Sequence, residues 1–211
     1  MTDEYVTRTL NAYNADPKKY EDATDEMILR EEIEEFMSRL SNRGLPVLDA
    51  GCAFGRDTAL FAKSGLRVEG IDMSDGLLKR ARELQPDLSF RKMDVRQLGF
   101  QDESFSGIWC NATLLHLTDE DIKRALDEFN RVLVPRGVIF MSLKEGEGEE
   151  ELIEKFSSNS ARYYNYHTTE TVRKLVESSD LKVAKLYTIN EREKWGEDKR
   201  DLNWVYCFAA K

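Results

Sequence analysis

Short apolar runs alternate with amphipathic helical stretches along the chain, and this alternation constrains the possible fold more than any other feature. The seven runs lie at residues 46–50, 66–71, 88–93, 106–111, 137–143, 181–189 and 202–209. Strands separated by helices in this way join a mostly parallel sheet that is covered on both faces. A charged segment without helical periodicity separates the last two runs, so we expect these two to form an antiparallel hairpin.

Apolar spacing also predicts individual helices. Residues 25–40 carry apolar side chains at helical spacing and are followed by Gly44, which suits a helix end. A further helix is expected over residues 119–133, with Thr118 as its N-cap. Residues 1–22 are polar with spaced tyrosines and predict a loosely helical arm outside the core. The acidic run 145–151 predicts a solvated loop.

Composition narrows the class of protein. The chain has 211 residues, which is the length of one domain, and its formal net charge of −9 disfavours broad binding to phosphate backbones. No apolar run approaches the roughly 18 residues that cross a bilayer, and acids stand where a signal peptide needs positive charge. The three cysteines include no CxxC pair, so we expect a cytoplasmic protein without a disulfide framework or a metal site.

The turn between the first apolar run and the following helix contains the residues Asp49-Ala50-Gly51-Cys52-Ala53-Phe54-Gly55-Arg56. Small residues in such a turn let a ligand lie against bare backbone, with N–H groups of the helix start directed toward it. The dinucleotide fingerprint needs glycine at positions one, three and six. Counted from Gly51, Ala53 and Arg56 occupy the third and sixth positions, which argues against a nicotinamide-dependent oxidoreductase. A strand–helix turn that binds nothing is the structural alternative.

The second apolar run ends in an acid, Asp72, 21 positions after Gly51. In doubly wound sheets an acid about 20 residues beyond the glycine turn hydrogen-bonds ribose hydroxyls. The structural alternative is an acid stabilised by the helix dipole, although Ser74 already provides a cap there. Together, the turn and Asp72 indicate a ligand that contains adenosine.

These segments resemble the class I S-adenosylmethionine-dependent methyltransferases, and the resemblance extends from about Tyr13 to Lys211. The segments similar to family motifs are residues 47–55, 70–74, 93–98, 105–117 and 133–139. Two positions depart from the pattern, since Ala53 and Arg136 stand where glycine is common. The resemblance implies an α/β, Rossmann-like, doubly wound sheet of seven strands, mostly parallel with an antiparallel last strand. It also implies S-adenosyl-L-methionine as cofactor and S-adenosyl-L-homocysteine as product.

The resemblance assigns roles to particular residues. It places Asp49 and Gly51 near the methionine end, Asp72 at the ribose, and Asp94 with Val95 at the adenine. The whole set of implied cofactor-binding residues is Tyr13, Tyr20, Asp49, Gly51, Cys52, Ala53, Gly55, Arg56, Asp72, Met73, Met93, Asp94, Val95 and Asn111. Tyr13 and Tyr20 resemble an N-terminal arm that closes over the cofactor. For the methionines and tyrosines, ordinary packing is the structural alternative.

The acceptor side is less defined by the sequence. His116 follows the fourth strand and is a candidate general base, with a structural histidine as the alternative. The substrate-binding candidates are Arg162, Tyr163, Tyr166 and His167, in a region that commonly lines acceptor pockets in the family. Arg162 could grip an acidic acceptor through two hydrogen bonds.

We therefore expect methyl transfer by in-line displacement to a small-molecule acceptor. The Pro-Pro-Tyr-type motif of amino-group nucleic-acid methyltransferases is absent after Asn111, which disfavours a nucleic-acid partner. An RNA or protein acceptor, or a non-catalytic cofactor-binding subunit, remains an alternative. We expect one domain over residues 1–211, with a helical arm at 1–40, a cofactor-binding half at 46–143, and an acceptor-side insert and terminal hairpin at 144–211. The sequence leaves the acceptor, the pathway and the oligomeric state open.

Overall fold

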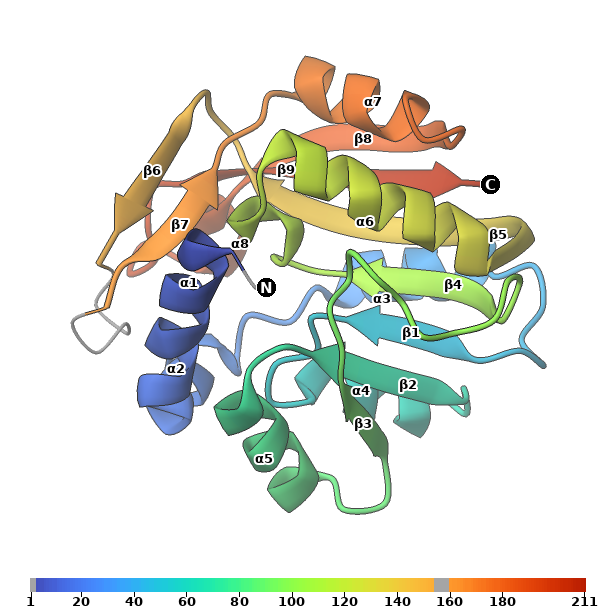
Figure 1. Cartoon of the computed structure of the whole chain (residues 1–211), viewed down its shortest axis with the longest axis horizontal. Coiled ribbons are helices and arrows are strands. Elements are labelled where there is room, and N and C mark those ends of the chain that lie inside the picture. Colours follow the sequence, from blue (N-terminus) through green and yellow to red (C-terminus); the bar gives the residue numbers. More distant parts are fainter. Residues whose placement is uncertain (1–2, 154–159) are drawn as a thin grey trace.

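The computed structural model describes residues 3–153 and 160–211. Seven strands form one sheet in the order β3-β2-β1-β4-β5-β9-β8 (Figure 1). These strands are β1 (Val47–Ala50), β2 (Val68–Asp72), β3 (Ser89–Lys92), β4 (Phe105–Cys110), β5 (Leu133–Lys144), β8 (Lys182–Asn190) and β9 (Asn203–Ala210). Pairing is parallel from β3 to β5, whereas β9 runs antiparallel to both of its neighbours. The predicted fold, including its reversed last strand, is confirmed.

The sheet order reverses direction next to β1, where the chain passes outward to β2 and β3 on one side and to β4 and β5 on the other. In open α/β sheets, ligands bind outside the carboxyl ends of the strands at such a switch point. The functional site is therefore expected beyond the ends of β1, β2 and β4.

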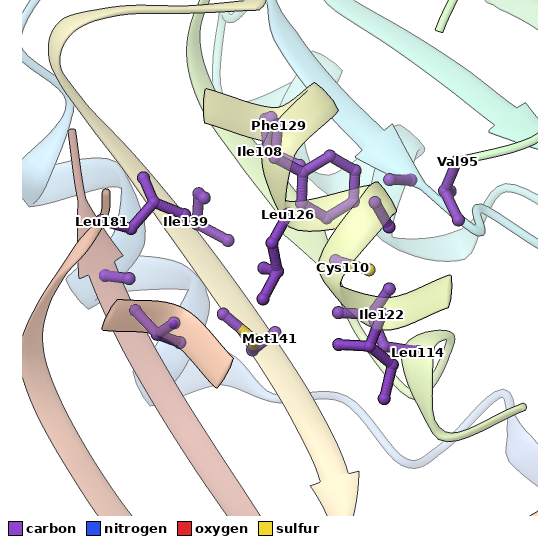
Figure 2. Close-up of a cluster of buried hydrophobic side chains, with 14 of the residues drawn as sticks. Val95, Ile108, Cys110, Leu114, Ile122, Leu126, Phe129, Ile139, Met141 and Leu181 are labelled. Atoms are coloured by element: carbon purple, nitrogen blue, oxygen red, sulfur yellow. The ribbon is translucent and has the colours of Figure 1, made fainter. Parts of the chain in front are cut away.

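Helices cover both faces of the sheet. They are α1 (Glu4–Ala15), α2 (Pro17–Thr24), α3 (Arg30–Arg39), α4 (Arg56–Lys63), α5 (Asp75–Leu84), α6 (Asp119–Val132), α7 (Thr169–Glu177) and α8 (Glu191–Trp195), with a short 3-10 helix, η1 (Leu114–His116). Helices α6 and α7 lie on one face of the sheet and α3 and α4 on the other (Figure 1). Their apolar side chains belong to two separate core clusters. Figure 2 shows Ile122, Leu126 and Phe129 of α6 lying over Ile108 of β4 and Met141 of β5.

Local signals explain where these helices begin. The Thr118 hydroxyl accepts from the Asp121 backbone N–H, as the capping signature predicts. The Ser74 hydroxyl caps α5 in the same way by accepting from the Leu77 N–H. Hydroxyl caps of this kind satisfy N–H groups that the first helical turn leaves without a partner.

Three local predictions are wrong. The N-terminal segment is no loose arm, because Val6 of α1 joins the main core cluster. The acidic run forms a strand, β6 (Glu149–Leu152), which pairs antiparallel with β7 (Arg162–Asn165) in a second small sheet. The segment between β8 and β9 contains α8, whose N-cap Asn190 accepts from two backbone N–H groups. No helix within the described ranges is long and apolar enough to span a membrane.

Candidate functional site

Two adjoining cavities lie at the predicted edge of the sheet. Both are concave, and each is lined by a mixture of apolar and polar side chains. Five residues line both cavities, namely Tyr13, Tyr20, Asn111, Ala112 and His116. The two cavities therefore meet at these side chains, which come from α1, α2 and the segment after β4.

The turn after β1 forms one wall of the first cavity through Gly51 and Ala53. Gly51 has a φ of 83°, and a Cβ at this position would lie 1.9 Å from the Thr113 hydroxyl oxygen. Ala53 has a φ of 49°, a left-handed conformation that alanine rarely adopts. The left-handed backbone and the small distance between the turn and Thr113 explain why the turn consists of small residues.

Asp72 lines the first cavity at the end of β2. Its two carboxylate oxygens accept from the backbone N–H groups of Ala53, at 2.9 Å, and Ser74, at 2.8 Å. Burial raises the pKa of Asp72, and these N–H groups oppose the rise. The carboxylate is thereby held rigidly beside the turn, with lone pairs remaining for a ligand because each oxygen accepts more than one bond.

Apolar side chains also line the first cavity, among them Met73, Met93, Val95 and Leu117. Asp94 lies there too, but its carboxylate is clamped by Arg96, whose Nη2 is 2.8 Å from Asp94 Oδ2. Arg96 also binds Asp121 at 2.7 Å and lines the cavity itself. Sequence reasoning missed Arg96, although an arginine two positions after an acid at a strand end is a visible signal.

Beneath the turn, two buried acids differ in their ionisation. Burial, together with the charge of Asp57, raises the pKa of Asp49 to about 8, and the Thr58 hydroxyl donates to its carboxyl group. Burial alone would also raise the pKa of Asp57, but Arg56, Trp109 and Asn111 hold it below its ordinary value. Near neutral pH, Asp49 therefore tends to hold its proton while Asp57 is ionised.

A chain of hydrogen bonds crosses the junction of the two cavities. The Arg162 Nη1 donates to the Tyr13 hydroxyl at 2.9 Å, and that hydroxyl lies 2.7 Å from His116 Nε2. On the other side of the ring, His116 Nδ1 lies 2.7 Å from the Tyr163 backbone carbonyl. A carbonyl only accepts, so Nδ1 is the donor and, in the neutral ring, Nε2 accepts from Tyr13.

The second cavity combines aromatic rings with cations. Its described lining includes Tyr164, Trp195, Trp204 and Tyr206 together with Arg56, Lys144, Arg162 and Arg200. The Lys144 ammonium lies 3.5 Å from the centroid of the Tyr164 ring. Most of these residues were not predicted, because they come from β5, β7, β9 and the segment between β8 and β9 and meet only in the folded chain.

The predicted cofactor residues divide between several places. The residues that line the first cavity are Tyr13, Tyr20, Gly51, Ala53, Asp72, Met73, Met93, Asp94, Val95 and Asn111. Arg56 lines the second cavity instead. Asp49, Cys52 and Gly55 line neither cavity; Cys52 belongs to a core cluster with Phe90, and Gly55 lies against the same ring.

The predicted acceptor residues also divide, and the alternation of side chains along β7 separates Arg162 from Tyr163. Arg162 lines the second cavity, whereas Tyr163, Tyr166 and His167 line neither one. The Tyr163 ring packs on Tyr5 instead, with 4.7 Å between centroids. The Tyr166 hydroxyl donates to Glu150, and His167 is buried with a lowered pKa caused by that burial. Among the described residues, no cluster of three or more histidine, cysteine or acidic side chains could hold a metal ion.

Comparisons with known proteins agree with this geometry. Residues 47–137 match the family model of the methyltransferase domain. The methyltransferase GfsG of Streptomyces halstedii is 35% identical over 112 residues, which cover 49% of this chain and 40% of the relative. The malonyl-[acyl-carrier protein] O-methyltransferase of Erwinia pyrifoliae is 36% identical over 103 residues, covering 48% of this chain and 38% of the relative. The chain thus spans about two fifths of the length of these curated relatives.

A solved structure matches the whole chain. The magnesium protoporphyrin IX methyltransferase of Synechocystis, with bound S-adenosylmethionine, has a TM-score of 0.72 and covers 100% of this chain and 98% of its own. Its sequence identity is 14%, so this likeness concerns the fold.

The fold is a doubly wound α/β domain, and the first cavity lies beyond the ends of β1 and β2, where domains of this kind bind ligands. The matched segment, residues 47–137, contains most of the residues that line this cavity, and the others lie in α1 and α2. Over residues 47–137 the chain contains a methyltransferase domain of the S-adenosylmethionine-dependent class. The cofactor of this class is S-adenosylmethionine.

Proposed function

We propose that the chain transfers a methyl group from S-adenosylmethionine, held in the first cavity, to a small-molecule acceptor in the second. The observation that carries the proposal is the shared lining at the junction, where Tyr13, Asn111 and His116 face both cavities. A methyl group has to pass from one ligand to the other at such a junction.

The residues of the first cavity suit S-adenosylmethionine. The Asp72 carboxylate would accept from the ribose hydroxyls, and the apolar side chains of Met73 and Val95 would pack around the adenine. Bare backbone at Gly51 and Ala53 would lie along the methionine end. Asp94 forms an ion pair with Arg96, so the two side chains together would form the polar rim at the adenine.

When bound, S-adenosylmethionine supplies a methyl group on a positively charged sulfur, and the acceptor lone pair forms the new bond as the S–C electron pair returns to sulfur. His116 would take the proton that a hydroxyl or amine acceptor loses, either at Nε2 or through the Tyr13 hydroxyl that donates to it. The bond from His116 Nδ1 to the Tyr163 carbonyl fixes the ring orientation. Alignment and exclusion of water supply much of the remaining rate.

The net charge of −9 and the aromatic lining of the second cavity favour a small molecule over an RNA acceptor. The names of the relatives refer to several different acceptors, so they do not define one for this chain. A non-catalytic cofactor-binding subunit would have no need of a second cavity that opens on the same histidine as the first.

Calorimetry and a labelled-methyl assay test the proposal. S-adenosylhomocysteine is expected to bind the full chain with a stoichiometry of one, while NAD does not bind. A screen of metabolites with methyl-labelled S-adenosylmethionine is expected to give a labelled low-molecular-weight product. NAD binding without S-adenosylhomocysteine binding, or label that enters only RNA or protein, would contradict the proposal.

A further inference from the structure

The hydroxyl of Tyr206 lies in the wall of the second cavity without a hydrogen-bond partner from the described part of the chain. Tyr206 belongs to β9, lines this cavity, and has an exposed fraction of only 1%. No group within residues 3–153 and 160–211 hydrogen-bonds its hydroxyl, and that oxygen is not among the polar atoms that the protein encloses completely. The hydroxyl therefore opens on the cavity.

Other polar groups near this wall have partners inside the protein. The Tyr187 hydroxyl, on the adjacent strand β8, donates to Glu32 at 3.2 Å. The indole N–H of Trp204, on β9 itself, donates to Glu191 at 3.2 Å. Buried polar groups nearly always have such partners, because an unpaired group loses its hydrogen bonds to water without compensation. The Tyr206 hydroxyl therefore needs a partner that enters the cavity.

The Tyr206 hydroxyl keeps its proton. Burial, followed by the charge of Glu32, raises the pKa of Tyr206 above its ordinary value. A protonated hydroxyl can donate one hydrogen bond and also accept from a donor. It can therefore bind either a donor or an acceptor group of a ligand.

The position of Tyr206 in the sheet separates it from the junction of the two cavities. Tyr206 pairs with Ser142 of β5, whose hydroxyl donates to Asn111 Oδ1 at 2.7 Å. Asn111 follows β4 and lines both cavities. Because β5 lies between β4 and β9 (Figure 1), two strand spacings, about 10 Å, separate the backbones of β4 and β9. A group bound by Tyr206 would thus be remote from the transferred methyl.

The cavity wall around Tyr206 is rich in aromatic rings. Trp204 lies two positions before Tyr206 on β9, so both side chains are on the same face of the strand, and Trp195 of α8 also lines the cavity. The bond to Glu191 occupies the indole N–H of Trp204, which leaves its ring surface for a ligand. Apolar side chains of the lining are Met27, Leu29 and Leu115. Flat rings pack well against such a wall.

Resting on the proposed function, we propose that the acceptor is a flat aromatic molecule whose hydrogen-bonding group binds the Tyr206 hydroxyl, at the end of the molecule remote from the methylated atom. Tyr206 is then an acceptor-binding residue that selects among aromatic compounds, while His116 at the junction would take the proton. This role explains why β9 has a tyrosine here, whereas Phe208, two positions later on the same face, packs in the core without a hydroxyl.

Three two-ring probes test the inference on the full chain saturated with S-adenosylhomocysteine, which would occupy the first cavity. They are 2-naphthol, naphthalene, which lacks the hydroxyl, and decahydro-2-naphthol, which keeps the hydroxyl but is not flat. Ligand-observed NMR measures their dissociation constants. We expect 2-naphthol to bind about fivefold or more tightly than decahydro-2-naphthol, because only the flat ring packs fully against the tryptophans.

The variant Tyr206→Phe removes the hydroxyl and keeps the ring. The preference for 2-naphthol over naphthalene is expected to fall about fivefold in this variant, which is the usual effect of one lost hydrogen bond. Tyr187→Phe is the matched control, because the Tyr187 ring lies 5.7 Å from the Tyr206 ring between centroids but lines neither cavity. Its preference is expected to remain that of the native chain.

Thermal unfolding without a probe gives a second readout. Tyr206→Phe should leave the unfolding midpoint unchanged or raise it, because the variant loses no hydrogen bond within the protein. Tyr187→Phe should lower the midpoint by about 2–4 °C, because it loses the bond to Glu32. An equal drop in Tyr206→Phe would show that the Tyr206 hydroxyl bonds the protein itself, and would overturn the inference.

Two binding results would also overturn the inference: a 2-naphthol preference that survives in Tyr206→Phe, or binding of decahydro-2-naphthol as tight as that of 2-naphthol. Binding of S-adenosylhomocysteine without binding of 2-naphthol contradicts this inference alone. A chain that does not bind S-adenosylhomocysteine contradicts the proposed function, so the two failures are distinguishable.

Discussion

The hydroxyl of Tyr13 lies 2.7 Å from Nε2 of His116, and the two residues are separated by 103 positions in the sequence. The same hydroxyl accepts from Arg162, and the opposite nitrogen of the ring faces the Tyr163 carbonyl. The first helix, the segment after β4 and the second small sheet therefore meet in one hydrogen-bonded chain. The N-terminal helix is thus part of the site, since it supplies a group that bonds the candidate base.

His116→Asn is expected to lower kcat by roughly 10²–10⁴-fold for a hydroxyl or amine acceptor, because it removes the proton acceptor. Binding of S-adenosylhomocysteine should change little, and calorimetry measures it separately. The control is His167→Asn, which changes the other histidine of the chain at a position that lines neither cavity. Its kcat should stay close to the native value. Equal losses in both variants would argue against a specific role for His116.

Much of the first cavity was predictable because many of its residues lie at the ends of strands that follow one another in the sequence. Gly51, Ala53 and Asp72 stand at strand ends whose order follows from the alternation of strands and helices. The second cavity was largely not predictable. Lys144 and Trp204 become neighbours only when β9 pairs with β5. Nothing in the sequence of either strand indicates that the two strands pair.

Alternation along a strand also limited the prediction at β7. The run Arg162-Tyr163-Tyr164 marks an acceptor region, but only the residues that face inward line the cavity. Which residues of β7 face the cavity depends on how β7 pairs with the acidic strand β6. The sequence analysis expected a loop over residues 145–151 and therefore did not include this pairing. Tyr163 was therefore predicted where Tyr164 belongs.

Two positions that depart from the family pattern share one backbone feature, a left-handed conformation. Ala53 and Arg136 stand where glycine is common in the resembling family, and both have positive φ values, 49° and 68°. The backbone thus keeps the left-handed conformation at both positions although the glycine is absent. A left-handed residue with a Cβ costs roughly 1–2 kcal/mol.

Ala53→Gly and Arg136→Gly should each raise the free energy of unfolding. The expected gain is about 0.5–1 kcal/mol, because relief of backbone strain exceeds the entropy that glycine adds to the unfolded chain. Urea unfolding measures it. Ala59→Gly, inside α4, is the control and should lower stability by about 1 kcal/mol or more. A loss of stability at residues 53 and 136 would contradict the strain argument.

Asp72→Asn should weaken the binding of S-adenosylhomocysteine by roughly 10- to 100-fold, because hydrogen bonds to a charged group contribute about 1.5–3 kcal/mol. Asparagine keeps one side-chain oxygen, which can accept from one of the backbone N–H groups of Ala53 and Ser74, whereas alanine would leave both without this partner. The control Asp75→Asn changes an exposed acid that pairs with Lys92 and should bind normally. Unchanged affinity in Asp72→Asn would refute the ribose assignment.

The raised pKa of Asp49 predicts how stability depends on pH. Its pKa is about 8 in the folded chain, against an ordinary value of 3.8, so the folded state holds this proton where the unfolded state has released it. Asp49 therefore makes stability fall as pH rises from about 4 to about 8, with a slope of at most about 1.4 kcal/mol per pH unit. Above that window its contribution to the slope disappears.

Asp49→Asn removes this titration while keeping a side chain of similar size. Urea unfolding of both chains at several pH values between 5 and 8 should show that the native chain loses stability relative to the variant as pH rises. Asp57 titrates below this window, because Arg56 and the other donors around it lower its pKa, so it adds no slope there. Other groups are common to both chains and cancel in the difference. Parallel stability curves would mean that Asp49 is ionised in the folded chain, and that the carboxylate beneath the turn after β1 carries its charge.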